Sequence, residues 1–100
     1  MIDEDGEGRR DEILAMLPDM LADFLATDVR NDAERCEELL AGLAGARHGE
    51  AFTAYGNLYQ LTADAGGATI SNAFDPSVGE AYLTLDAMIS ILRAWRAAIG

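Results

Sequence analysis

The sequence has no lysine, one cysteine, one histidine and no long apolar run, and each shortage argues against a class of protein. Seven arginines stand against 18 acidic residues, which gives a net charge of -11. A nucleic-acid-binding surface needs clustered cations, and an anionic membrane would repel so acidic a chain. No apolar run approaches the roughly 20 residues that cross a bilayer. We therefore expect neither nucleic acid nor a membrane as a partner.

Cysteine and histidine are too few for the common metal and catalytic sites. A structural zinc ion needs four such ligands, and the chain offers only Cys36 and His48. No acidic run has the spaced ligands of a calcium loop. Cys36 lies on the apolar side of a helical pattern, where cysteine acts as a small buried hydrophobe, and His48 follows that helix in a glycine-rich exit. We predict no metal, no cofactor and no catalytic residue.

The length fits one domain, and the composition favours helices over an extensive sheet. Half of the residues are apolar, but 18 of them are alanine and only two are valine. The first eight residues, MIDEDGEG, are acidic and interrupted by glycine, so we interpret 1–8 as a flexible acidic tail and 9–100 as a single α+β domain. The sequence opens without a secretory-signal pattern, and we expect a cytoplasmic protein.

Two helices are predicted in the N-terminal half. Apolar residues recur at steps of three and four over residues 9–26, which gathers them on one side of a helix. Pro18 interrupts this pattern, either by kinking the helix or by starting a second short one, and we interpret the stretch as one bent helix. Asn31 lies three residues before Glu34, a spacing that resembles a capping box, so the second helix is expected to start there and to stop near Ala46.

The second half opens with alternating β-formers, which predict an antiparallel sheet of two or three strands. The expected strands lie before Gly56-Asn57, over 58–64 and over 68–74, and 81–83 is a candidate for a further short edge strand. Ala65-Gly66-Gly67 fits a tight hairpin turn, because glycine adopts the positive φ that such turns need. Gly56-Asn57 fits either a second turn or a bulge inside one longer strand.

A C-terminal helix is the clearest amphipathic element. Thr84 is a candidate N-cap, Asp86 complements the helix dipole, and apolar residues follow helical spacing from Leu85 to Ile99. The order of elements gives an α+β fold with two N-terminal helices, a small antiparallel sheet and this helix packed on one sheet face.

Negative charge is concentrated in the N-terminal half. Residues 1–50 hold fourteen acidic residues and five arginines, whereas residues 51–100 hold four and two. If the two predicted helices pack as an antiparallel pair, their acidic faces merge into one anionic surface. A net charge of magnitude roughly 2 to 8 already keeps a small domain soluble, so the excess favours a cationic partner that the charge steers into place. The acidic residues on these faces are Glu34, Glu37 and Glu38 on the second helix and Asp19 and Asp23 on the first.

Four segments of the C-terminal half form one pattern: Tyr55-Gly56-Asn57-Leu58-Tyr59-Gln60-Leu61, Ala65-Gly66-Gly67, Ala68-Thr69-Ile70-Ser71, and Leu83-Thr84-Leu85-Asp86 running to Leu92 and Trp95. This pattern, over residues 50–98, resembles small bacterial immunity proteins, the antitoxins of contact-dependent growth inhibition and related polymorphic toxin systems. The resemblance implies a non-catalytic cytosolic inhibitor that binds a toxin domain, often a nuclease, and blocks its active site or substrate path. It transfers no binding residue to this chain.

The first hypothesis is therefore an immunity protein whose five acidic helix residues bind a basic toxin domain. The alternative is a nucleic-acid mimic such as a phage anti-CRISPR protein, which would occupy a cationic groove on an effector complex. An enzyme is a third option, and it needs Cys36 and His48 at hydrogen-bond distance. Homodimerisation through Tyr55, Tyr59 or Tyr82 needs no other partner, although the edge of a core is the more usual place for such tyrosines.

Overall fold

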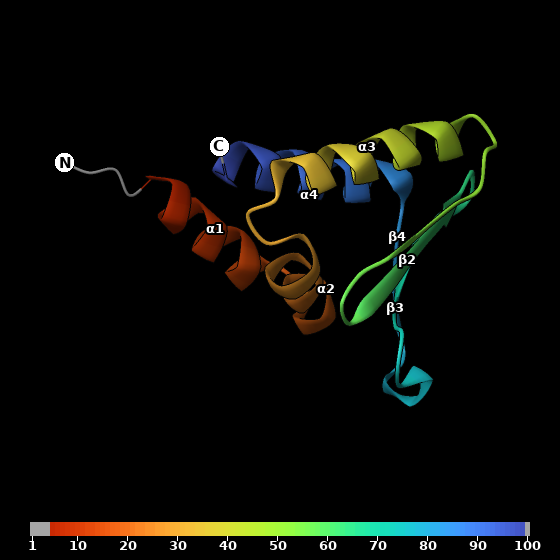
Figure 1. The fold of residues 1–100 in the computed structure, drawn as a ribbon, viewed down its shortest axis with the longest axis horizontal. Coiled ribbons are helices and arrows are strands. Elements are labelled where there is room, and N and C mark those ends of the chain that lie inside the picture. The colour runs from red at the N-terminus through yellow and green to blue at the C-terminus, as the bar shows by residue number, and fades with distance from the viewer. Residues whose placement is uncertain (1–4, 100) are drawn as a thin grey trace.

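The computed structural model describes residues 5–99 and has the α+β fold that the sequence predicts (Figure 1). The sheet has four strands rather than two or three, because the short segment at 80–83 pairs as an edge strand. The elements are α1 (Asp5–Met16), α2 (Asp19–Phe24), the π-helical turn η1 (Leu25–Val29), α3 (Ala33–Arg47), β1 (Phe52–Tyr55), β2 (Tyr59–Asp64), β3 (Gly67–Asn72), the 3-10 turn η2 (Pro76–Val78), β4 (Glu80–Leu83) and α4 (Leu85–Ile99).

The N-terminal helices differ from the prediction at both ends of α1. This helix begins at Asp5 rather than at Arg9, where the apolar spacing begins, and residues 1–4 lie outside the described part of the chain. Pro18 breaks the predicted bent helix, since it has no N–H to continue α1, and its carbonyl accepts from the Ala22 N–H at 2.9 Å to start α2.

The connection from α2 to α3 runs through a widened helical turn. In η1 the Arg30 N–H donates to the Leu25 carbonyl, five residues back, at 2.7 Å. The chain then leaves the helix at Arg30, whose backbone φ of 54° is rare for residues other than glycine. The N-cap of α3 is Asp32 rather than the predicted Asn31, because the Asp32 carboxylate accepts from the Arg35 N–H at 3.0 Å.

The sheet is an antiparallel meander in the order β1-β2-β3-β4. Gly56-Asn57, which the sequence left open, is a turn between β1 and β2, and the Gly56 N–H donates to the Tyr59 carbonyl at 2.8 Å. A Cβ on Gly56 would overlap the Asp28 carboxylate, so only glycine fits there without a shift.

The predicted second turn and the predicted cap of the last helix are both confirmed. Ala65 and Gly66 connect β2 to β3, and the following Gly67 has φ of 147°. The Thr84 hydroxyl oxygen accepts from the Ala87 N–H at 3.0 Å and caps α4. Both features depend on local chemistry, and for that reason the sequence alone located them.

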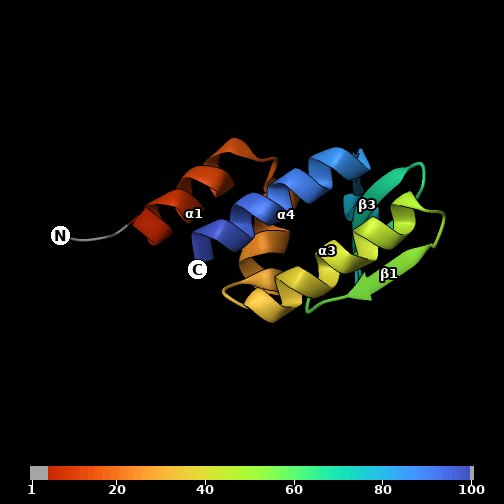
Figure 2. The same cartoon turned by 90° about the horizontal axis from the view of Figure 1, so that it is seen from above.

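The helices α2, α3 and α4 lie against one face of the sheet (Figures 1 and 2). The C-terminal helix α4 packs on the sheet as predicted, and α3 runs beside it in the opposite direction (Figure 2). The ring of Phe52 in β1 lies so close to Gly42 of α3 that a Cβ on this glycine would overlap the ring. Helix α1 packs against α4, which also packs against α3, and α2 packs against β3 and β4. The antiparallel helix pair considered from the sequence is therefore not formed.

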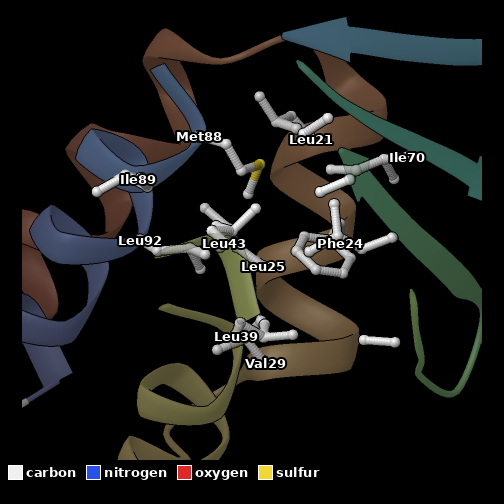
Figure 3. Close-up of a cluster of buried hydrophobic side chains, with 14 of the residues drawn as sticks. Leu21, Phe24, Leu25, Val29, Leu39, Leu43, Ile70, Met88, Ile89 and Leu92 are labelled. Carbon is white, nitrogen blue, oxygen red and sulfur yellow. The ribbon is translucent and has the colours of Figure 1, made fainter. Parts of the chain in front are cut away.

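The core lies between the helices and the inner sheet face (Figure 3). Trp95 of α4 is buried, and its Nε1 donates to the Arg30 carbonyl at 2.7 Å, which ties the last helix to the end of η1. The labelled core side chains in Figure 3 are Leu21, Phe24, Leu25, Val29, Leu39, Leu43, Ile70, Met88, Ile89 and Leu92.

Candidate functional site

The three acidic residues predicted on α3 are exposed, but arginines of the chain partner two of them. Glu37 Oε2 lies 3.1 Å from Arg96 Nε of α4, and Glu38 Oε1 lies 3.4 Å from Arg35 Nη1. Glu34 is exposed on the same helix. Exposed ion pairs contribute at most about 1 kcal/mol each, yet each arginine offsets the charge of its carboxylate and so weakens the field that a distant partner would sense.

The two acidic residues predicted on α2 lie elsewhere, in a groove between α2 and one end of the sheet. Asp19 and Asp23 line it with apolar side chains of the helices and with Tyr59, and no residue of α3 takes part. The Tyr59 hydroxyl donates to Asp23 Oδ2 at 2.6 Å. The structure therefore places the five predicted residues in two separate areas and does not merge them into one anionic surface.

Cys36 and His48 do not meet. The Cys36 side chain is fully buried, and its Sγ donates to the Leu92 carbonyl at 3.4 Å. Burial raises the pKa of this thiol, with smaller opposing and supporting effects from nearby charges, so the reactive thiolate is disfavoured. His48 is exposed at the end of α3, twelve residues along the same helix and therefore roughly 18 Å away. The geometry offers no nucleophile and base pair from these two residues.

Sequence reasoning missed Asp28, the buried carboxylate that joins the helices to the sheet. Its side chain is 8% exposed, and it accepts from the Tyr59 N–H at 2.8 Å and from the Leu58 N–H at 3.1 Å. The Thr27 hydroxyl donates to the same carboxylate at 3.1 Å. A signal existed, because Asp28 continues the apolar helical spacing of Leu21 and Phe24, where a carboxylate is out of place unless it is hydrogen-bonded.

The face of the sheet that points away from the helices is uncovered. Burial alternates along β2 and β3, as expected for strands with one face in the core. Strand pairing aligns the outward side chains in two rows across all four strands, Thr53-Thr62-Thr69-Tyr82 and Tyr55-Gln60-Ser71-Glu80. We call these eight residues the outer sheet face.

Two tyrosines are the large apolar groups of the outer sheet face. Tyr55 on β1 is 68% exposed and Tyr82 on β4 is 75% exposed. The Tyr82 hydroxyl donates to the Glu80 carboxylate at 2.7 Å, which holds the ring against its own strand and raises the pKa of this phenol. Exposed aromatic rings with a polar end are typical of protein interfaces.

The connection from β3 to β4 presents a further exposed aromatic residue. Phe74 is 75% exposed, and the loop that carries it is held by its own side chains. Asn72 Oδ1 accepts from the N–H groups of Phe74 and Asp75, each at 2.8 Å, and Asp75 Oδ1 accepts from the Ser77 N–H at 3.1 Å. Figure 1 shows this loop extending beyond the rest of the molecule at the end of the sheet.

Positive charge is absent from the sheet-forming segment. The sequence has no lysine and no arginine between Arg47 and Arg93, a stretch that includes all four strands and their turns. Arg35 reaches the end of β1 from α3, where its Nη2 donates to the Tyr55 carbonyl at 2.9 Å. The outer sheet face therefore combines tyrosine, threonine and carboxylate side chains with no cation of its own.

Comparison with family models, with curated proteins and with solved structures finds no match for this chain. Within residues 5–99 no three acidic, histidine or cysteine side chains come together as metal ligands. In the same range, no helix has the length and apolar character that crossing a membrane requires.

Proposed function

We propose that this chain is a cytoplasmic immunity protein that binds a basic toxin domain, such as a nuclease, and blocks it without any catalytic step of its own. The proposal keeps the partner inferred from the sequence and moves the main contact from the helices to the outer sheet face. The observation that carries it is that this face is uncovered, bears two exposed tyrosines and has no positive charge.

The chemistry of the outer sheet face supports a protein partner. Buried aromatic anchors supply much of the binding energy of protein interfaces, and Tyr55 and Tyr82 are available for this role. The rows between them carry polar side chains with hydrogen-bonding groups, and two pockets open on these rows. One has a volume of about 670 Å³ and is lined in part by Thr53, Thr62 and Thr69, and the other has a volume of about 520 Å³ and is lined in part by Gln60, Ser71 and Glu80. A basic partner meets no cation on this face, whereas an acidic partner gains no ion pair there.

Neighbouring arginines make the acidic helices a less favourable docking surface than the outer sheet face. A partner approaching Glu37 or Glu38 must compete with Arg96 or Arg35, which already lie beside these carboxylates. Glu34 remains available as a peripheral contact that speeds association. The net charge of -11 acts over the whole molecule and attracts a basic protein whichever face finally binds it.

A nucleic-acid mimic is less well supported. Duplex DNA carries one negative charge per about 1.7 Å of its axis, and a mimic needs carboxylates in comparable density. The two rows of the outer sheet face contain Glu80 as their single carboxylate, with Asp64 beyond the end of the rows. The immunity-type hypothesis requires no such repeat.

The test compares two arginine substitutions with the same change in charge. Thr53→Arg places a cation on the outer sheet face, and Ala41→Arg places one on the exposed side of α3. The partner is the product of the adjacent open reading frame, and binding is measured by isothermal titration calorimetry. We expect Thr53→Arg and Tyr82→Ala each to weaken binding about tenfold or more, and Ala41→Arg to change it less than about threefold.

Two results would contradict this assignment. If Ala41→Arg weakens binding and Thr53→Arg does not, the partner docks on the acidic face of α3. If light scattering instead finds a homodimer that Thr53→Arg dissociates, the outer sheet face is covered by a second copy of this chain. Circular dichroism of each variant shows whether the fold is intact.

A further inference from the structure

A groove between α2 and the end of the sheet combines apolar walls with two carboxylates. It has a volume of about 660 Å³, and Leu14, Met20 and Val78 contribute its apolar surface. Asp19 and Asp23 lie in the same lining, and no arginine or histidine does. The groove is therefore suited to a group that is apolar along its length and cationic at its end.

The two carboxylates are placed together by the helix. Asp19 and Asp23 are four residues apart on α2, so they lie on the same helix face one turn apart. Like charges at this spacing repel each other, and the repulsion costs roughly 0.2 to 0.5 kcal/mol in an isolated helix. A cation bound between them would remove this cost.

One of the carboxylates is held in position from the sheet. The buried Tyr59 donates its hydroxyl to Asp23 Oδ2 at 2.6 Å, and among the side chains that the structure describes no hydrogen bond uses Asp23 Oδ1. This hydrogen bond, with burial and nearby negative charge, raises the pKa of Tyr59 to about 12, so the phenol stays a donor throughout the physiological range. A carboxylate fixed in this way binds a cation at a lower entropic cost.

We propose that this groove binds an arginine side chain of the basic partner protein. The aliphatic part of arginine packs along Leu14, Met20 and Val78, and its planar guanidinium donates to the carboxylates of Asp19 and Asp23. Arginine fits better than lysine because its several N–H groups can contact two carboxylates at once. The inference rests on the proposed function, since it assigns a residue of that partner to a place on this chain.

The groove is tested first without the partner. The probe is N-acetyl-arginine methylamide, and N-acetyl-citrulline methylamide is the neutral control of the same shape. Binding is followed by NMR shifts of the Asp19, Asp23 and Tyr59 amides and of the Met20 methyl group. We expect saturable shifts at these groups with the arginine probe and none with the citrulline probe.

Matched double variants separate the groove from general electrostatics. Asp19→Asn with Asp23→Asn removes two charges four residues apart on α2, and Glu34→Gln with Glu38→Gln removes two at the same spacing on α3. The α2 variant should weaken arginine binding about tenfold, because charge-assisted hydrogen bonds are lost, and the α3 variant should change it less than twofold. Asparagine at 23 can still accept from Tyr59, so the fold is preserved.

Tyr59→Phe tests the role of the positioning hydroxyl. It keeps the buried ring and removes the donor to Asp23, and we expect arginine binding to weaken about threefold while Asp19 shifts persist. An unchanged affinity would show that Asp23 needs no support from the sheet.

The outcomes separate this inference from the proposed function. If the arginine probe leaves the groove resonances unchanged, or shifts α3 equally, the groove assignment is wrong, even if the partner still binds the outer sheet face. If the probe binds in the groove but the adjacent gene product does not bind the chain, the groove assignment stands. The proposed function and the proposed partner are then both wrong. Tenfold weaker partner binding by the α2 double variant supports both.

Discussion

The helical region and the sheet differ in how they carry charge. All seven arginines lie in the helices or in the connection before α3, and at least four of them, Arg10, Arg35, Arg47 and Arg96, bond to carboxylate or amide side chains of the same region. The strands and their turns contain carboxylates and no arginine. The negative charge of the N-terminal half of the sequence indicates the helices as the surface for a basic partner. The lack of arginine in the strands and their turns favours the sheet instead.

The two regions also differ in what holds them together. A continuous apolar core joins the helices to the inner face of the sheet, whereas the links from the helices to the β1–β2 end of the sheet are polar. Asp28 accepts from two sheet N–H groups, Tyr59 donates to Asp23, and Arg35 donates to the Tyr55 carbonyl. Core substitutions should therefore destabilise helices and sheet together, and loss of the polar links should loosen the β1–β2 end of the sheet from the helices.

The largest effect is expected from Trp95→Ala, which breaks the helical region. Trp95 is buried and donates to the Arg30 carbonyl, so its removal should lower the free energy of unfolding by roughly 3 to 5 kcal/mol. Chemical denaturation measures the loss. Trp95→Phe should lose less, because a ring still fills part of the site. A loss well under 1 kcal/mol for the alanine variant would mean that α4 packs differently.

Asp28→Ala should separate the two regions at their polar link. It leaves the N–H groups of Leu58 and Tyr59 without their acceptor at a buried site, and we expect a loss of roughly 2 to 3 kcal/mol. Hydrogen exchange should show faster exchange at the β1–β2 turn than in α4. Asp75→Ala, which removes a carboxylate that accepts only within an exposed loop, is the control and should cost under about 0.5 kcal/mol. Equal losses for the two variants would refute the role of Asp28.

A pair of glycine substitutions tests the contact between α3 and β1. Gly42→Ala should lower stability by about 1 to 2 kcal/mol, because the new Cβ overlaps the Phe52 ring and forces a shift. Gly45→Ala on the same helix places its Cβ 3.1 Å from Oε1 of the flexible Glu50 side chain, and it should be neutral or stabilising by up to about 1 kcal/mol. Similar thermal stabilities for the two variants would contradict the close packing at Gly42.

The last effect is confined to alkaline pH and concerns Tyr59. The unfolded chain has an ordinary tyrosine pKa near 10, whereas the folded state raises the pKa of Tyr59 to about 12, mainly through the hydrogen bond to Asp23. Folding therefore favours the protonated phenol, and this contribution is complete below pH 10 and is lost as the pH rises toward 12. The stability difference between the protein and Tyr59→Phe should shrink over that interval and stay constant from pH 7 to 9. A constant difference up to pH 12 would show that the hydrogen bond is not formed.

Local signals in the sequence predicted much of the fold. The spacing of apolar residues located α4, Thr84 identified its cap, and Ala65-Gly66-Gly67 identified a turn, because each depends on neighbouring residues alone. Pro18 was recognised as an interruption, although the break between α1 and α2 was interpreted as a bend. The strand β4 is only four residues long, which is too short for its alternation to predict it firmly.

The features that the sequence did not predict depend on how the helices and strands pack together. The sequence identified the acidic residues of α2 and α3, but their separation depends on α2 packing against β3 and β4 while α3 packs against β1 and β2, which no local pattern encodes. The pairing of Tyr59 with Asp23 joins residues 36 positions apart. The outer sheet face is uncovered because the helices pack against the other face of the sheet, and this arrangement is not encoded in a local pattern either. The acidic residues of the helices and the tyrosines of the sheet were therefore recognised in the sequence, whereas Asp28 and the surfaces that these residues form were not.

NMR titration of the labelled protein with the product of the adjacent open reading frame tests the central claim most directly. We predict shifts of the amides of outward residues such as Thr62, Thr69 and Tyr82, together with those of Asp19 and Asp23 in the groove. Shifts confined to the α3 and α4 surface, or a catalytic change in the added protein, would contradict the account.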